Sequence, residues 1–127
     1  MSETTFPVRL ERGIPVVAAP AEIDITSAGL LRTALLAARA IGRRALVVDM
    51  TGTHFCDSAA LNVLVRAHQQ AEAEGCEVRL IMSGTDVLRI FMVTGIDSVI
   101  PIFASLDEAL RRAPEPVPAP PAGLTAG

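Results

Sequence analysis

Lysine, tryptophan and tyrosine are all absent from this chain of 127 residues, and phenylalanine occurs only four times. Without lysine, the chain has no side chain for the cationic position of a Walker-A loop and none that forms Schiff bases. The scarcity of aromatic residues removes the groups on which nucleic-acid bases stack, and a net charge of −3 without any basic run offers little to phosphates. These absences argue against P-loop enzymes and against nucleic-acid binding.

Cysteine and histidine are also scarce, with two residues of each. No C-x-x-C or H-x-x-x-H spacing favours a metal site. The acidic segment 1–5 is not followed by an apolar signal region, and no apolar run reaches membrane-spanning length. We therefore expect a cytoplasmic protein, without membrane contact, whose two thiols are free. Cys76 is expected to fill apolar space, and Cys56 to be buried unless a helix N-terminus lowers its pKa and makes it reactive.

Half of the residues are hydrophobic, which predicts one domain with a core of Val, Leu, Ile and Ala. Residues 6–12 alternate apolar and polar side chains, and residues 14–19 are mostly apolar, so the two segments form an antiparallel hairpin around Gly13. Thr26 or Ser27 can then cap a helix that ends near residue 41. The apolar stripe predicted for this helix consists of Leu30, Leu31, Ala34, Leu35 and Ala38.

The centre of the chain is a buried strand, Ala45–Val48, followed by a loop over 51–57 and a helix from Ser58 to about Glu74. Strands and helices continue to alternate after it. The later elements are expected at 78–82 (strand), 87–93 (helix), 99–103 (strand) and, after the capping-box sequence Ser105-Leu106-Asp107-Glu108, a helix to about Ala113.

This alternation predicts an α/β fold with a mostly parallel sheet, one antiparallel edge strand and helices packed around the sheet. Function in such sheets gathers at the carboxyl ends of the strands. Three loops meet there, at 20–25, 50–58 and 83–86. They carry the polar side chains Asp24, Asp57, Ser58, Ser83 and Asp86, and we expect an acidic rim around one serine.

Ser58 is the most distinctive residue of that rim. Asp57 is a good helix N-cap, so Ser58 falls at the first helical position, exposed at the positive end of the helix dipole. Asn62 and Arg66 follow on the same polar face at one-turn spacing. This is a suitable place to attach or remove a phosphate. The alternative is that Ser58 only satisfies free N–H groups at a helix start.

Catalysis finds little support in the same residues. A serine hydrolase needs a base, and His68 lies about 15 Å along the helix from Ser58. His54 could reach the serine, but no G-x-S-x-G elbow surrounds it. Asp24, Asp57 and Asp86 could gather around Mg²⁺, although a solvated acidic rim is the simpler interpretation. We expect no enzyme activity, no cofactor and no metal.

Four segments carry a resemblance to a known family. They are Ala21-Glu22-Ile23-Asp24, Leu46-Val47-Val48-Asp49, Phe55-Cys56-Asp57-Ser58-Ala59-Ala60-Leu61 and Val93-Thr94-Gly95-Ile96. Together they resemble the STAS domain, and more narrowly the bacterial anti-sigma factor antagonists. The family pattern D-S-S-G-L-G is altered here. Ala59 removes a second serine, while Ala60 and Asn62 replace glycines and favour a firmer helix.

The resemblance implies a regulatory switch. The antagonist binds an anti-sigma factor, which is itself a serine kinase, and so frees a sigma factor. The kinase phosphorylates the serine, here Ser58, and a phosphatase resets it. Asp24, Asp57, Ser58, Asn62 and Arg66 would contact the partner. The alternative is a stand-alone STAS subunit of another assembly, such as a stress-signalling scaffold or a lipid-transport complex, in which Ser58 is only a contact residue.

The resemblance covers about residues 6–112, and the STAS domain is expected at 6–113. Residues 114–127 are mostly Pro, Ala and Gly, which predicts a disordered tail. The sequence leaves open the identity of the kinase, the sigma factor and the stimulus.

Overall fold

The computed structural model describes residues 5–111. The strands are β1 (Val8–Glu11), β2 (Ile14–Ala18), β3 (Glu22–Ile23), β4 (Ala45–Asp49), β5 (Phe55–Cys56), β6 (Glu77–Ile81) and β7 (Ile102–Phe103). The helices are α1 (Ala28–Ala40), α2 (Ser58–Ala73), α3 (Thr85–Val93) and α4 (Leu106–Arg111), with a 3-10 turn, η1, at Ile96–Ser98. The disordered tail predicted for 114–127 lies outside the described residues.

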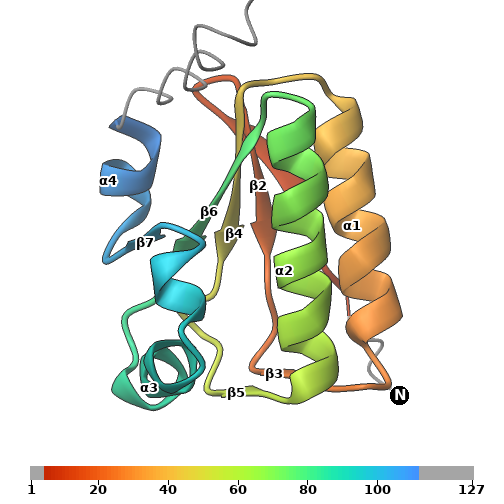
Figure 1. Ribbon diagram of the computed structural model, residues 1–127. Coiled ribbons are helices and arrows are strands. Elements are labelled where there is room, and N and C mark those ends of the chain that lie inside the picture. Colours follow the sequence, from red (N-terminus) through yellow and green to blue (C-terminus); the bar gives the residue numbers. More distant parts are fainter. Residues whose placement is uncertain (1–4, 112–127) are drawn as a thin grey trace, which may run out of the picture.

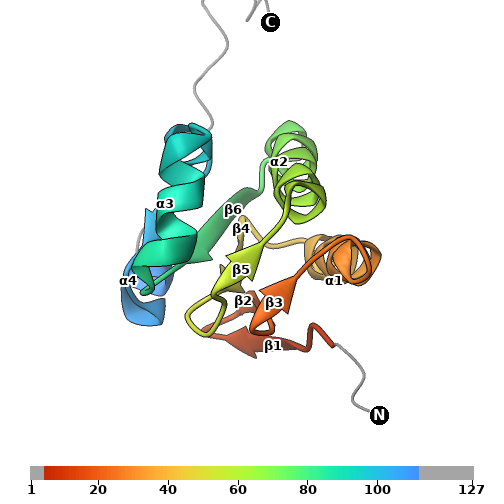
Figure 2. The same ribbon diagram turned by 90° about the horizontal axis from the view of Figure 1, so that it is seen from below.

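The main sheet has the order β1-β2-β4-β6-β7. β1 and β2 pair antiparallel around Gly13, and every other neighbouring pair is parallel. The sequence therefore correctly predicts a mostly parallel sheet with one antiparallel edge strand. In Figure 1, α1 and α2 stand side by side on one face of the sheet. Figure 2, an end view, places α4 on the opposite face.

The larger core lies between the sheet and the helices α1, α2 and α3. The strands contribute Val17, Val48 and Leu80, and α1 and α2 contribute Leu31 and Leu64, all five fully buried. These side chains are branched and aliphatic, as the composition predicts, and they supply most of the apolar burial that stabilises the fold. A smaller core of Val16, Val47, Ile81 and Ala109 lies under α4.

The hairpin turn and the helix ends follow the local rules. Gly13, Gly42 and Gly75 have φ values of 79°, 81° and 77°, a region that L side chains rarely adopt. Gly42 and Gly75 each lie two residues after the last residue of α1 and α2, where a residue with positive φ commonly ends a helix. The Ser105 hydroxyl accepts a hydrogen bond from the Glu108 amide (3.2 Å), which confirms the predicted cap of α4.

Two segments expected to be loops contain strands. β3 and β5 form a separate two-stranded parallel sheet that pairs Glu22 with Phe55 and Ile23 with Cys56. The prediction of a loop at 20–25 and at 51–57 is therefore wrong at these four positions. Each strand is only two residues long, too short to show an alternation of apolar and polar side chains. Their pairing ties together the two loops that precede α1 and α2.

Two further expectations need correction. Leu30 is 49% exposed, so the apolar stripe of α1 is formed by Leu31, Leu35 and Ala38 with Ala34 beside them. The last strand is also shorter than the predicted 99–103, because η1 and a bend precede it and only Ile102–Phe103 pair with β6. Pro101 removes a backbone donor at the start of that strand, which helps to limit its length.

Candidate functional site

Asp57 links two segments through its carboxylate. One oxygen, Oδ1, accepts a hydrogen bond from the Ala60 amide (3.1 Å) and so caps α2. The other, Oδ2, accepts a hydrogen bond from the Ile25 amide (2.9 Å), in the loop that follows β3. The predicted N-cap is confirmed. Through its bond to the Ile25 amide, Asp57 also holds the loop before α1 against the start of α2.

Asp24 lies in that same loop and forms a tight turn. Its Oδ1 accepts hydrogen bonds from the Thr26 amide (2.9 Å) and from the Thr26 hydroxyl. These donors, the hydroxyl first, stabilise the carboxylate and hold the pKa of Asp24 below its ordinary value of 3.8. The Ser27 hydroxyl accepts from the Asp24 amide (3.1 Å), so Ser27 orders this turn rather than capping α1 with its side chain.

Ser58 is exposed in the first turn of α2, as predicted. Its side chain makes no hydrogen bond to any residue in the range 5–111. Both oxygens of the neighbouring Asp57 are already engaged by backbone amides. The Ser58 hydroxyl is therefore available to solvent or to a partner, in a position where the helix dipole favours added negative charge. Asn62 and Arg66 are exposed on the same face, one and two turns along α2.

Two apolar side chains near Ser58 were not anticipated from the sequence. Ile25 is 75% exposed and Phe55 is 44% exposed. The Ile25 amide bonds to Asp57, and Phe55 lies three residues before Ser58 on β5, so both belong to the surface around the serine. Exposed apolar side chains beside polar groups are suited to contact with another protein. The sequence feature that could have indicated this surface is Phe55, one of four phenylalanines in a chain that has no other aromatic side chains of the Trp or Tyr type.

The residues proposed for catalysis or metal binding are not brought together. His54 is exposed, and no hydrogen bond joins it to Ser58 among the described residues. His68 is buried on the inner side of α2, where its Nε2 atom lies 3.5 Å from Glu72. Within residues 5–111, no group of three or more His, Cys, Asp or Glu side chains is arranged to hold a metal ion. Ser83 bonds to the Thr51 carbonyl (3.4 Å), which keeps the third loop beside the second.

Cys56 is buried directly before this surface, with 4% of its area exposed. Burial raises the pKa of its thiol from 9.0 to about 12, and the charge of Asp57 acts in the same direction. The hypothesis that the helix N-terminus lowers this pKa and makes Cys56 reactive is therefore wrong. Cys76 is likewise free and buried, and burial also raises its pKa. Both thiols are buried, as predicted for Cys76 and in the first of the two predictions for Cys56.

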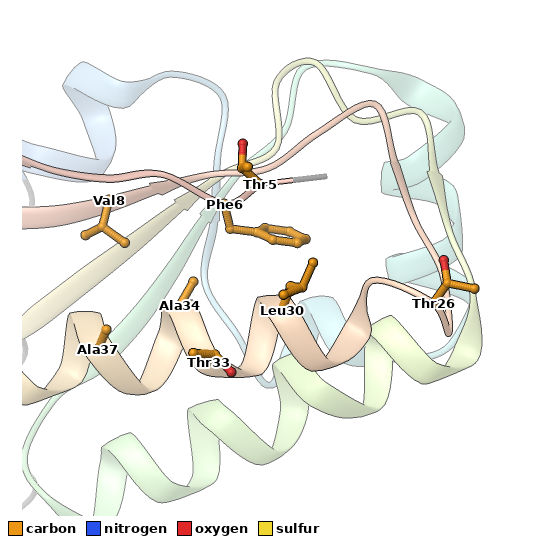
Figure 3. A pocket seen from close by; sticks show the side chains of 8 residues that line it. All are labelled: Thr5, Phe6, Val8, Thr26, Leu30, Thr33, Ala34 and Ala37. Carbon is orange, nitrogen blue, oxygen red and sulfur yellow. The ribbon is translucent and has the colours of Figure 1, made fainter. Parts of the chain in front are cut away.

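A groove of about 800 Å³ runs between β1 and α1 and ends near the same surface (Figure 3). Phe6 and Leu30 face each other across it, and Thr26, from the Asp24 turn, lies at one end. The groove explains why Leu30 points away from the main core. Since none of the side chains that line it is ionisable, it offers apolar and hydroxyl contacts but no acid–base chemistry.

One finding concerns membranes. None of the helices within the described range is both long enough and apolar enough to cross a bilayer.

Comparison with proteins of known sequence gives a family match. The model of the STAS domain family matches residues 5–109 of the chain. The anti-sigma-F factor antagonist RsfB of Mycobacterium tuberculosis is 26% identical over 106 residues, which cover 84% of this chain and 86% of RsfB. A second protein of that organism, Rv2638, is grouped by its name with the anti-anti-sigma factors. It is 33% identical over 67 residues, but the match spans only 45% of its length.

Solved structures agree with the sequence comparison. The crystal structure of an anti-sigma factor antagonist from Mycobacterium paratuberculosis superposes with a TM-score of 0.77 at 30% identity, covering 85% of this chain and 92% of that one. Unphosphorylated SpoIIAA, also an anti-sigma factor antagonist, gives a TM-score of 0.67 at 18% identity over 84% of this chain and 93% of its own, a likeness of fold alone. The family match, the 30% identical relative and the shared fold confirm the resemblance seen in the sequence: the chain belongs to the STAS domain family.

Proposed function

We propose that this protein is an anti-sigma factor antagonist that binds an anti-sigma factor through the surface around Ser58 and is released when Ser58 is phosphorylated. The observation that carries the proposal is the division of roles between two adjacent residues. Asp57 is fully engaged in holding the backbone, whereas the Ser58 hydroxyl has no partner within residues 5–111 and is exposed.

The composition of this surface supports binding to a protein. Exposed Ile25 and Phe55 offer apolar contact next to the hydroxyl. Asp24, Asn62 and Arg66 add polar groups at its edges. An apolar centre with a polar rim is the usual anatomy of a protein–protein interface. The residues named from the sequence, Asp24, Asp57, Ser58, Asn62 and Arg66, remain the predicted contact set, to which we add Ile25 and Phe55.

Phosphorylation would change this surface through charge. A phosphoryl group carries about −1.5 to −2 charges at neutral pH, and here it would be placed beside the Asp57 carboxylate. The first turn of α2 can accommodate it within the free protein. Inside an interface, the same charge must lose its water and meets apolar neighbours. A penalty of about 3 kcal/mol would lower the affinity more than a hundredfold.

The names of the relatives support the same proposal. RsfB and the Mycobacterium paratuberculosis protein are both named antagonists of anti-sigma factors. SpoIIAA of Bacillus has been solved in a phosphorylated form, and its fold also matches, with a TM-score of 0.64. By analogy, we infer that the kinase is the anti-sigma factor itself, that a phosphatase removes the phosphate, and that the chain acts in the cytoplasm as a binding protein without catalytic activity of its own.

Affinity capture from the host's lysate tests the proposal. Baits would be the wild-type protein, Ser58→Ala and Ser58→Asp, with Ser98→Asp as the control, because Ser98 is also exposed but lies on η1. We expect wild type, Ser58→Ala and Ser98→Asp to retain an ATP-binding anti-sigma factor that Ser58→Asp loses, and the purified factor to phosphorylate wild type but not Ser58→Ala.

Capture of a different complex by all four baits would contradict the proposal. In that case the protein would be a STAS subunit of a scaffold or of a lipid-transport complex, and Ser58 would be an ordinary contact or helix-start residue.

A further inference from the structure

Five arginines make no ion pair with any described residue. The ion pairs within residues 5–111 engage Arg9, Arg12, Arg39, Arg79 and Arg111. Those left over are Arg32, Arg43, Arg44, Arg66 and Arg89. Four of these five lie on α1, on α2 or just after α1, and all four are exposed. Unneutralised positive charge is thus concentrated on one layer of a molecule whose net charge is −3.

A groove between α1 and α2 collects part of this charge. Its floor is apolar, and its polar lining consists of Arg32 and Arg39 from α1 with Arg66 and Gln70 from α2. Arg39 is already engaged, with Glu74 (3.1 Å) and with Gln70 (3.2 Å). The guanidinium groups of Arg32 and Arg66 make no ion pair or hydrogen bond with any residue in the range 5–111. Because α1 contains no acidic residue, nothing on that helix offsets Arg32, and the groove retains two positive charges.

This groove continues the surface around Ser58. Arg66 follows Ser58 by eight residues, about 12 Å along the helix axis, and Asn62 lies between them on the same exposed face. Arg32 reaches the groove from α1, which stands beside α2 in Figures 1 and 2. A partner seated on Ser58 and extending along α2 would therefore meet Arg66 and Arg32 together.

We propose that the groove between α1 and α2 is a second docking point for the anti-sigma factor and takes an acidic segment of it, with Glu or Asp side chains placed between Arg32 and Arg66. This inference rests on the proposed function. Charge complementarity supports it, because each of the two guanidinium groups can bind a carboxylate in a bidentate manner. The groove measures about 120 Å³, a size that suits inserted side chains rather than a whole small ligand.

Such a contact has a defined role. Charges at the rim of an interface act mainly on the rate of association and on its salt dependence. Phosphorylation of Ser58 would leave Arg32 and Arg66 unchanged, so the basic groove could still attract the acidic segment after the Ser58 surface has been released. The groove would thereby raise the rate at which the anti-sigma factor binds again once Ser58 is dephosphorylated.

Titration calorimetry with the purified anti-sigma factor, the one retained by wild type and lost by Ser58→Asp, tests the inference. We expect Arg32→Glu/Arg66→Glu to weaken binding about tenfold or more at about 50 mM NaCl, and the difference to fall below about threefold at about 500 mM, where charges are screened. Arg32→Gln/Arg66→Gln should lie between that variant and wild type. Arg43→Glu changes the net charge like one of these substitutions but lies outside the groove, and should stay within about twofold of wild type.

Equal affinity of wild type and Arg32→Glu/Arg66→Glu at low salt would overturn the inference while leaving the proposed function intact, since Ser58→Asp would still abolish binding. A salt-dependent dimer of the wild-type chain that Arg32→Glu/Arg66→Glu abolishes would also overturn it, because the occupant would then be the acidic rim of a second copy. Failure of the wild-type chain to bind any anti-sigma factor would instead reject the proposed function. Thermal melting of each variant checks that it is folded.

Discussion

Asp57 uses each of its carboxylate oxygens on the backbone of a different segment. One bond fixes the first turn of α2, and the other fixes the loop that carries Ile25. The residue is thus a structural link at the centre of the candidate surface. Its neighbour Ser58 makes no comparable bond within the described chain and is exposed.

Replacing Asp57 should therefore destabilise the fold in steps. Asp57→Ala removes both bonds, and a lost cap alone costs about 1 kcal/mol, so we expect a loss of about 2 kcal/mol. Asp57→Asn retains one acceptor oxygen and should lose about half as much. Urea denaturation measures both. If the two variants were equally stable, the bond that the asparagine oxygen retains would contribute nothing.

The Cys56 thiol gives a prediction for alkaline pH. Its pKa is about 12 in the folded protein, against an ordinary 9.0. Between these values the folded state holds a proton that the unfolded chain has lost. Stability is therefore complete below about pH 9 and decreases as the pH rises from there towards 12, by up to about 1.4 kcal/mol per pH unit.

Denaturation curves between about pH 8 and 11 measure this effect. Cys56→Ala is the matched control, because it removes the titrating group, and its stability should decrease less steeply over the same range. A Cys56 thiol that reacts with iodoacetamide in the native protein as fast as in urea would contradict the buried, protonated state.

At this scale, the sequence predicts what local rules determine. An Asp followed by Ser before an apolar helix specifies the cap and the exposed hydroxyl without reference to the rest of the fold. Ile25 and Phe55 could not be placed in this way. Whether an apolar side chain is exposed depends on which segments pack over it, and in the folded chain Ile25 remains 75% and Phe55 44% exposed.

Arg79 anchors the element α4 from beneath. It lies on β6 with no exposed area, its Nη1 donates to the Ala109 carbonyl (2.6 Å), and its Nε pairs with Glu77 (2.7 Å). The Nη2 group has no hydrogen-bond partner within residues 5–111. A short helix of six residues is thus held by a buried charge as well as by apolar contacts.

Removing only one member of this pair should be costly. Glu77→Ala leaves the Arg79 charge buried without its counterion, and we expect a loss of about 3 kcal/mol in unfolding free energy. The double change Glu77→Leu/Arg79→Met removes both charges and should recover at least half of that loss. Urea denaturation compares them. A double variant less stable than Glu77→Ala would mean that the bond to Ala109 outweighs the burial of charge.

The prediction of elements succeeded where the sequence pattern is long enough to be periodic. Helix α2 and strands β2, β4 and β6 were placed within about one or two residues. The paired β3 and β5 were missed because a strand of two residues shows no period, and they exist only because two distant loops meet. Leu30 was assigned to the core because the predicted apolar stripe of α1 included one residue too many. The side chain of Leu30 instead lines the groove between β1 and α1.

At the scale of the whole molecule, the candidate surface and the core are separate. The buried side chains lie between the sheet and its helices, whereas Ser58 and its neighbours occupy the edge where the strands end and α2 begins. A charge added at that edge should alter what the protein binds without altering whether it folds.

The stability of Ser58→Asp tests this separation. An acidic side chain in the first turn of a helix is stabilised by about 0.3–1 kcal/mol through the helix dipole, so the variant should melt at or slightly above the temperature of wild type. Ser58→Arg, which reverses the charge at the same position, should melt lower. If Ser58→Asp unfolded more easily than wild type, its loss of partner binding would no longer indicate a switch.

The double role of Asp57 has a consequence for tracing how this family diverges. Selection for a folded domain alone is enough to preserve an acidic residue here, whether or not any kinase acts on the chain. A descendant that gave up phosphorylation would be free to lose Ser58 yet would still retain Asp57. The aspartate therefore reflects the shared architecture of the fold, and the serine beside it is the residue whose presence bears on the proposed phosphorylation.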